Sequence, residues 1–255
     1  MQRIIAVIEN TFKEALRQRI LVLIGVFSAL IIMVSIFVTP FALGEASKIL
    51  RDIGLAVPAL LGVLVAIIVG SQLIHKDIEK RTIYTVITRP VRRSEIVVGK
   101  FLGLLLLILV LQVGMAIVQQ LTLFAYEGAF DLRLFIAFPF LLLEIAVLLG
   151  ILLLFSSFST PTLSSIMGVI FFIIGHASPD LKLFADQVNV PLFKYIAYGF
   201  YYILPNLENF NYRLELVHHL PLYTDQVLYS IAYGIIYTVF LIYFAIIIFE
   251  DREFK

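Results

Sequence analysis

Long, uninterrupted apolar runs dominate this chain. Hydrophobic residues make up 61% of its 255 residues and charged residues only 15%, whereas a soluble domain is nearer half apolar and a quarter charged. A helix needs roughly 20 apolar residues to cross a bilayer core, because each residue adds about 1.5 Å. The sequence therefore predicts an all-α polytopic membrane protein, a single transmembrane domain over 1–255. The six spans are expected at residues 20–38, 53–74, 99–124, 134–155, 162–178 and 226–249.

Residues 1–19 precede the first span. Apolar side chains recur there at helical spacing, and charged side chains fall on the other faces. This pattern predicts an amphipathic helix lying at the membrane surface. A solvated helix packed on the protein itself is the alternative. The apolar positions are Ile5, Ile8, Phe12 and Leu16.

A long loop is expected over residues 179–224. Within it, residues 192–204 are rich in aromatic side chains, which prefer the membrane–water interface, but are too few to span. Two interpretations of these residues remain: a re-entrant or interfacial segment, and an ordinary outer loop with an aromatic belt.

Lysine and arginine are divided unevenly between the two sides that six spans define. Thirteen lie on the side that contains both termini, and six lie on the other side. Because cytoplasmic loops carry an excess of these residues, both termini are expected in the cytoplasm of a protein of the cell (inner) membrane. The net charge of +1 gives no basis for a nucleic-acid partner.

Motifs of nucleotide-binding or metal-dependent enzymes are missing from the sequence. It contains neither G-x-x-x-x-G-K-[ST] nor H-E-x-x-H, and it has no cysteine. We therefore expect no catalytic residue, cofactor or metal in this chain. An intramembrane enzyme would also need polar groups that converge at one depth. Glu144, Gln112 and His176 are expected at different depths, which argues against such an enzyme.

Glu144 lies near the middle of the fourth expected span. A carboxylate there costs about 2.5–3.5 kcal/mol on insertion scales, so it should face the protein interior or a water-filled cavity, or be protonated. It is a candidate pathway or gating residue, and a structural hydrogen bond between helices is the alternative. Gln112, in the third expected span, is a second candidate, although hydrogen bonding between helices is the default role of such an amide.

The region 75–100 is the densest polar segment. Its basic residues could simply fix the loop on the cytoplasmic side. However, Ile83, Val86 and Ile87 interleave with the polar residues, so a short helix here would have an apolar face. An exposed face of that kind suits a partner protein.

The stretch DIEKRTIYTVITRPVRRSEIVVGKFLG resembles a recurrent signature of permeases of the type-2 ABC export class. The signature is an acidic residue, a threonine, an apolar stretch, then proline, a basic residue and a Gly-Lys that opens the third span. ENTFKEALRQRILVLIGVFS resembles the family's entry helix and first span, and LLLFSSFSTPTLSSIMGVIFFIIGH its fourth-to-fifth-span junction. YYILPNLENFN resembles an outer-loop motif of the multi-copper enzyme maturation subgroup. The matching signature positions are Glu79, Thr82, Pro90, Arg92 or Arg93, Gly99 and Lys100.

The resemblance implies the transmembrane subunit of an ATP-binding cassette transporter, which exports a substrate or transmits force and is not itself an enzyme. Such subunits work as dimers, here expected to be a homodimer. Two copies of a separate P-loop ATPase would bind ATP and Mg. The segment 77–93 would be the coupling helix that docks on the ATPase, and the turn at 156–161 would be a second contact. The implied ATPase-coupling residues are Glu79, Arg81, Thr82, Arg89, Pro90, Arg92 and Arg93.

The resemblance leaves the cargo open, and it leaves room for a periplasmic or outer partner. A stand-alone secondary transporter is the main alternative. That class would favour internal repeats and several ionisable residues at the midplane. The sequence shows no convincing repeat and one deep carboxylate.

Overall fold

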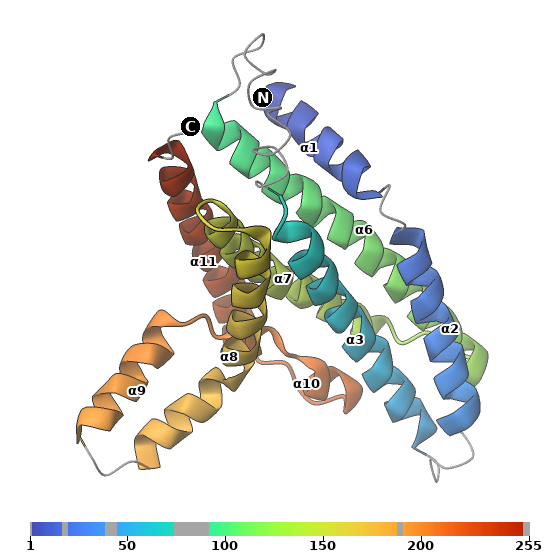
Figure 1. Cartoon of the computed structure of the whole chain (residues 1–255). Helices are drawn as coiled ribbons and strands as arrows, with labels where there is room; N and C mark the ends of the chain where they lie inside the picture. Colours follow the sequence, from blue (N-terminus) through green and yellow to red (C-terminus); the bar gives the residue numbers. More distant parts are fainter. Residues whose placement is uncertain (1, 17–19, 39–44, 74–91, 188–190, 252–255) are drawn as a thin grey trace.

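The computed structural model describes residues 2–16, 20–38, 45–73, 92–187 and 191–251, and within these ranges the chain is helical without strands (Figure 1). The elements in chain order are α1 (Gln2–Leu16), α2 (Ile20–Val38), α3 (Ala46–Val65), the π-helical turn η1 (Ala66–Gly70), α6 (Arg93–Glu127), the 3-10 turn η3 (Leu132–Ile136), α7 (Ala137–Ser156), α8 (Pro161–Gln187), α9 (Pro191–Ile203), the 3-10 turn η4 (Leu207–Phe210), α10 (Arg213–Val217) and α11 (Thr224–Asp251).

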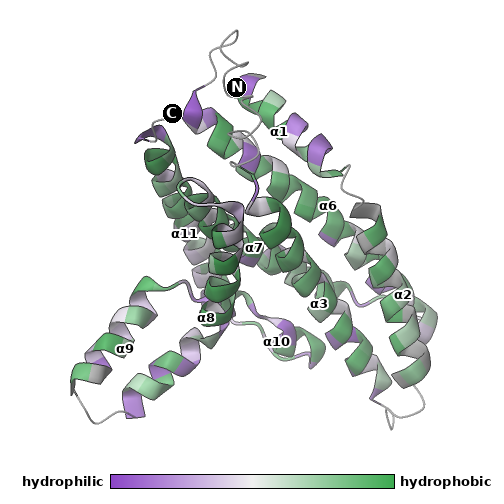
Figure 2. Ribbon diagram, in the orientation of Figure 1, coloured by the Kyte–Doolittle hydropathy of each residue, from purple (hydrophilic) through white to green (hydrophobic). Residues whose placement is uncertain are grey.

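Among the described residues, five helical stretches are long and apolar enough to cross a membrane. Figure 2 shows apolar residues along these helices. The prediction of an all-α polytopic membrane protein is therefore confirmed. α2 is 19 residues long and has no charged side chain, but the count of six spans stays a prediction. The five stretches are Ala46–Gly70, Arg93–Glu127, Leu132–Ser156, Pro161–Gln187 and Thr224–Asp251.

The start of α1 and the end of α11 lie at the same end of the bundle (Figure 1). The start of α6 and the turn between α7 and α8 lie at this end too. The α6–α7 connection and α10 lie away from it. We call the end of the bundle that contains the start of α1 and the end of α11 the terminal end. The opposite end, with the α6–α7 connection and α10, is the distal end.

α1 is packed on the protein's own α6. At Gly103 of α6, an added Cβ would lie 2.7 Å from the Thr11 Cβ and 2.9 Å from the Ile8 carbonyl oxygen. Thr11 and Ala15 are buried at this contact, whereas Ile5, predicted for the apolar face, is 59% exposed. The predicted helix is confirmed, and one of its faces packs against α6 of the bundle. Its position at a membrane surface stays a prediction.

A row of small residues lets α3 approach α6 and α7 closely. An added Cβ at Gly54 would collide with Gln119 of α6, and one at Gly62 with Ile145 of α7. The i+4 row of a helix is inclined to its axis, which explains why successive members of the row meet different neighbours. The row is buried throughout and consists of Gly54, Pro58, Gly62, Ala66 and Gly70.

The prediction of a long loop over 179–224 is wrong, because much of this region is helical. α8 continues through Pro179 to Gln187 and changes direction on the way (Figure 1). A proline inside a helix is a usual cause of such a kink. The aromatic segment predicted at 192–204 is the helix α9, which returns beside the end of α8.

Polar and aromatic contacts hold α9 to the end of α8. The Tyr198 hydroxyl donates a hydrogen bond to Asp186, which raises the pKa of Tyr198. The Lys182 ammonium lies 5.6 Å from the centre of the Tyr201 ring, within the range of a cation–π interaction. The two helices therefore form a hairpin that is held together by contacts between their side chains as well as by the chain that connects them.

The α1–α6 contact predicts unequal effects of two glycine substitutions. Gly103→Ala should lower the free energy of unfolding by about 1–3 kcal/mol, because the new methyl group meets a backbone carbonyl. Gly25→Ala should be neutral or slightly stabilising, because nothing lies within 4 Å of its added Cβ. Thermal unfolding of both variants in one detergent measures the difference. Equal stabilities would contradict the α1–α6 packing.

Candidate coupling and ligand sites

At the terminal end, the chain leading into segment 74–91 is bound to two other helices. The Lys100 ammonium of α6 donates a hydrogen bond to the Leu73 carbonyl. The Ser156 hydroxyl, at the end of α7, donates to the Ser71 carbonyl at 3.2 Å. Lys100 and Ser156 are both buried. A cation is well placed at a helix C-terminus, where carbonyl groups are left over.

The chain leaving the same segment is also anchored. The Arg92 backbone N–H donates to the Glu95 carboxylate at 2.9 Å, which stabilises the start of α6. The Arg93 guanidinium donates to the carbonyl oxygens of Phe249 and Glu250, at 3.2 and 2.8 Å. Arg93 thus joins α6 to the C-terminal end of α11.

Most of the predicted coupling residues lie outside the described part of the chain. Arg92 is described and exposed, and Arg93 is partly buried against α11. The turn predicted as a second ATPase contact lies at the same end as these residues (Figure 1). The residues outside the description are Glu79, Arg81, Thr82, Arg89 and Pro90.

A second candidate site is a cavity of about 220 Å³ between α3, α7, α8 and residues 210–213. Glu144 of α7 lines it and is 4% exposed. His176 of α8 lines it too, with Nε2 3.6 Å from Glu144 Oε1. Its other ring nitrogen, Nδ1, lies 3.2 Å from the Phe172 carbonyl oxygen. The remaining walls are mostly apolar and aromatic and include Leu55, Ala59, Leu141, Phe172, Phe210 and Tyr212.

The prediction that Glu144 and His176 lie at different depths is wrong. α7 and α8 are consecutive helices joined by a short turn and pack against each other. Glu144 comes twelve residues before the end of α7 at Ser156, and His176 comes fifteen residues after the start of α8 at Pro161. Similar distances from the turn give similar depths, because each residue rises about 1.5 Å.

Gln112 is not among the residues that line this cavity. It is 1% exposed and lies next to Gly62, at the contact of α3 with α6 and α7. Neither side-chain amide atom has a hydrogen-bond partner. The structure therefore separates Gln112 from the cavity that Glu144 lines, and its predicted role in a pathway stays a prediction.

The η4 turn closes one side of the cavity and was missed by the sequence analysis. Leu207 and Phe210 are almost fully buried. A Cβ added at Gly175 of α8 would lie 2.5 Å from Leu207 Cγ, and one at Gly234 of α11 would lie 2.9 Å from Phe210 Cε1. The two glycines therefore provide the space into which the side chains of η4 fit.

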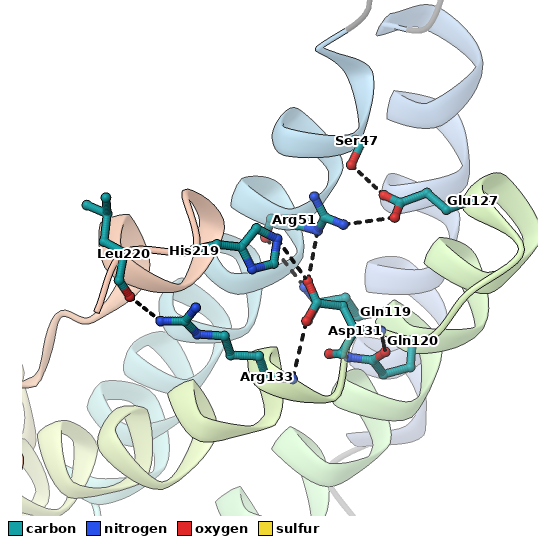
Figure 3. Close-up of polar contacts among 9 residues, drawn as sticks. All are labelled: Ser47, Arg51, Gln119, Gln120, Glu127, Asp131, Arg133, His219 and Leu220. Carbon is teal, nitrogen blue, oxygen red and sulfur yellow. Dashed lines mark hydrogen bonds and ion pairs between the residues drawn. The ribbon is translucent and has the colours of Figure 1, made fainter. Parts of the chain in front are cut away.

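A network of charged residues joins α3, α6 and the start of η3 toward the distal end (Figure 3). Arg51 is its centre: its Nη2 atom lies 2.8 Å from Glu127 Oε2, and its Nε atom lies 3.0 Å from Asp131 Oδ2. Ser47 donates a hydrogen bond to the Glu127 carboxylate. Arg51 is 13% exposed, so the two carboxylates neutralise a largely desolvated cation.

The same network reaches the chain between α10 and α11 (Figure 3). His219 Nε2 lies 3.7 Å from Asp131 Oδ2, and Arg133 donates a hydrogen bond to the Leu220 carbonyl. Gln120 exchanges two hydrogen bonds with the Asp131 backbone, at 2.7 and 3.0 Å. No sequence motif predicted this network, because its members come from four separate elements.

Within the described ranges, no group of three His, Asp or Glu side chains is placed to hold a metal ion. The fold defines a helical polytopic membrane protein. The family model of the ABC-2 family transporter proteins matches residues 5–254. The chain belongs to this family and is a permease component of an ABC transporter, a class that is not itself catalytic and generally pairs with an ABC ATPase. A search of curated proteins found no match.

The charged network predicts a large loss of stability when its central cation is removed. Arg51→Met should lower the free energy of unfolding by on the order of 3 kcal/mol, because it leaves two poorly solvated carboxylates without their partner. Lys48→Met removes the exposed pair with Glu45, the residue that precedes α3, and should cost less than about 1 kcal/mol. Denaturant unfolding of the two variants compares these effects, and equal losses would refute the assigned importance of Arg51.

Proposed function

We propose that this chain is the permease subunit of a transporter that couples ATP hydrolysis on a separate ATPase to substrate export or to force transmission across the membrane. It would work as a homodimer with two copies of a P-loop ATPase, which would bind ATP and Mg. It would lie in the cell (inner) membrane with the terminal end in the cytoplasm. Family membership and the Lys and Arg excess at that end support this assignment.

The observation that carries the proposal is the anchoring of segment 74–91 at both ends. Its entry is bound to α6 and α7 through Lys100 and Ser156, and its exit is bound to α11 through Arg93. A displacement imposed on the segment by a bound ATPase would act on all of these helices. The ATPase can shift the permease only between conformations that it binds with different affinities.

The contacts of Arg93 assign different roles to two adjacent arginines. Reversing the charge of Arg93 would remove hydrogen bonds to the end of α11, so its effect could not be attributed to ATPase binding. Arg92 has an exposed side chain and is the better docking candidate, together with Arg89, another of the implied ATPase-coupling residues.

The proposal also concerns the subgroup of the family and an outer partner. The YYILPNLENFN stretch, which resembles the multi-copper enzyme maturation subgroup, contains the η4 turn that closes one side of the cavity. We assign the chain to that subgroup on this resemblance. A periplasmic or outer partner would then meet the distal end.

Charge reversal tests the docking proposal. Arg89→Glu combined with Arg92→Glu should reduce co-purification of the ATPase at least tenfold, because it replaces two cations with anions on the proposed docking surface. The measurement is a pull-down of the tagged permease from solubilised native membranes, followed by mass spectrometry.

Lys48→Glu, an exposed substitution on α3 outside the proposed docking segment, serves as the control and should leave co-purification unchanged. Full co-purification by the doubly reversed protein would contradict the docking map. Reproducible absence of any P-loop ATPase from the folded wild-type protein would contradict the proposed coupling itself.

A further inference from the structure

We infer that the cavity between α3, α7 and α8 binds a small organic cation with apolar substituents. The identification of this cation as cargo rests on the proposed transport function, whereas its binding does not. The inference stands on three observations: the size of the cavity, the charge of its polar groups, and the aromatic rings among its lining residues.

The size of the cavity limits the ligand. Its volume is about 220 Å³, somewhat larger than the ~150 Å³ apolar cavity that is known to hold benzene. A single ring with a small charged substituent fits this space, and a lipid with two acyl chains does not. The walls contributed by α3 and by most of α7 are aliphatic, which favours an apolar body for the ligand.

The polar groups of the cavity favour a positive charge. Glu144 is the deepest of them, and a buried carboxylate is unfavourable unless a cation or hydrogen-bond donors face it. His176 Nδ1 lies 3.2 Å from the Phe172 carbonyl oxygen, which places the proton of a neutral ring on Nδ1. Nε2 then presents a lone pair toward Glu144 at 3.6 Å and does not neutralise it.

The other charged groups near the cavity do not change this balance. Arg213 lines the cavity, but its guanidinium lies 2.6 and 3.2 Å from the two carboxylate oxygens of Asp52. That pair carries no net charge. The site therefore favours a cation and repels an anion.

Aromatic side chains supply the third feature of a cation site. Phe172, Phe210 and Tyr212 all line the cavity. The faces of such rings attract organic cations, with roughly 2 kcal/mol available when the pair is desolvated. The Tyr212 hydroxyl is already hydrogen-bonded to Ser230 at 2.8 Å, which fixes the position of this ring.

The arrangement makes binding sensitive to protons. A protonated Glu144 would have no charge to attract the ligand, so affinity should fall as the pH is lowered. The charge of a permanently charged ligand does not vary with pH. With such a ligand, a change of affinity with pH therefore reports on the protein alone.

The test is a calorimetric titration of the purified permease, reconstituted in lipid nanodiscs without an ATPase, with benzyltrimethylammonium. Neopentylbenzene, which replaces the charged nitrogen with carbon, is the matched neutral probe. The cation should bind at least tenfold more tightly than the neutral probe, and Glu144→Gln, which keeps the shape of the side chain, should reduce cation affinity at least tenfold. Cation affinity should also fall as the pH is lowered, and this fall should be absent from Glu144→Gln.

Three results would overturn the inference: no binding of the cation, equal affinity for the two probes, or full affinity in Glu144→Gln. Equal affinity would identify an apolar pocket instead of a cation site. Because the titration contains no ATPase, its result is independent of the coupling proposal. Cation binding by a protein that captures no ATPase would leave the site intact and remove the transport role.

Discussion

Close approach between helices is the constraint on which the rest of this structure depends. Lipid tails are as apolar as the side chains of a membrane helix, so no hydrophobic effect drives such helices together. They associate through tight packing and polar contacts instead. The small-residue row of α3 provides that packing against α6 and α7, and Gly103 provides it between α6 and α1. These contacts fix where α7 lies, and therefore where Glu144 meets its cavity.

The positions of the helices could be predicted from the sequence because a bilayer fixes the length of an apolar run. The same reasoning failed between Pro179 and Tyr223, where polar and aromatic residues mask helices that lie outside any apolar run. The fifth span was expected to end at residue 178, yet α8 continues through Pro179 to Gln187. α6 begins at Arg93, before the span expected at 99–124, and the Glu95 contact that stabilises this start is a local cap with no apolar signal.

The candidate site was predictable only in part. Glu144 was singled out by the cost of a buried carboxylate, and its proximity to His176 could have been found by counting residues from the α7–α8 turn. The fit of Leu207 against Gly175 could not have been found in that way, because it joins residues that no sequence period connects. The Arg51 network was hidden for the same reason, since charges near the ends of spans indicate orientation and not pairing.

The register of α7 and α8 has a consequence for how the length of this chain can vary among relatives. One residue inserted within either helix between Glu144 and His176 would rotate the following part by about 100° and shift it by about 1.5 Å. Such a change would turn the imidazole away from the carboxylate. The number of residues from 144 to 176 should therefore be kept among relatives.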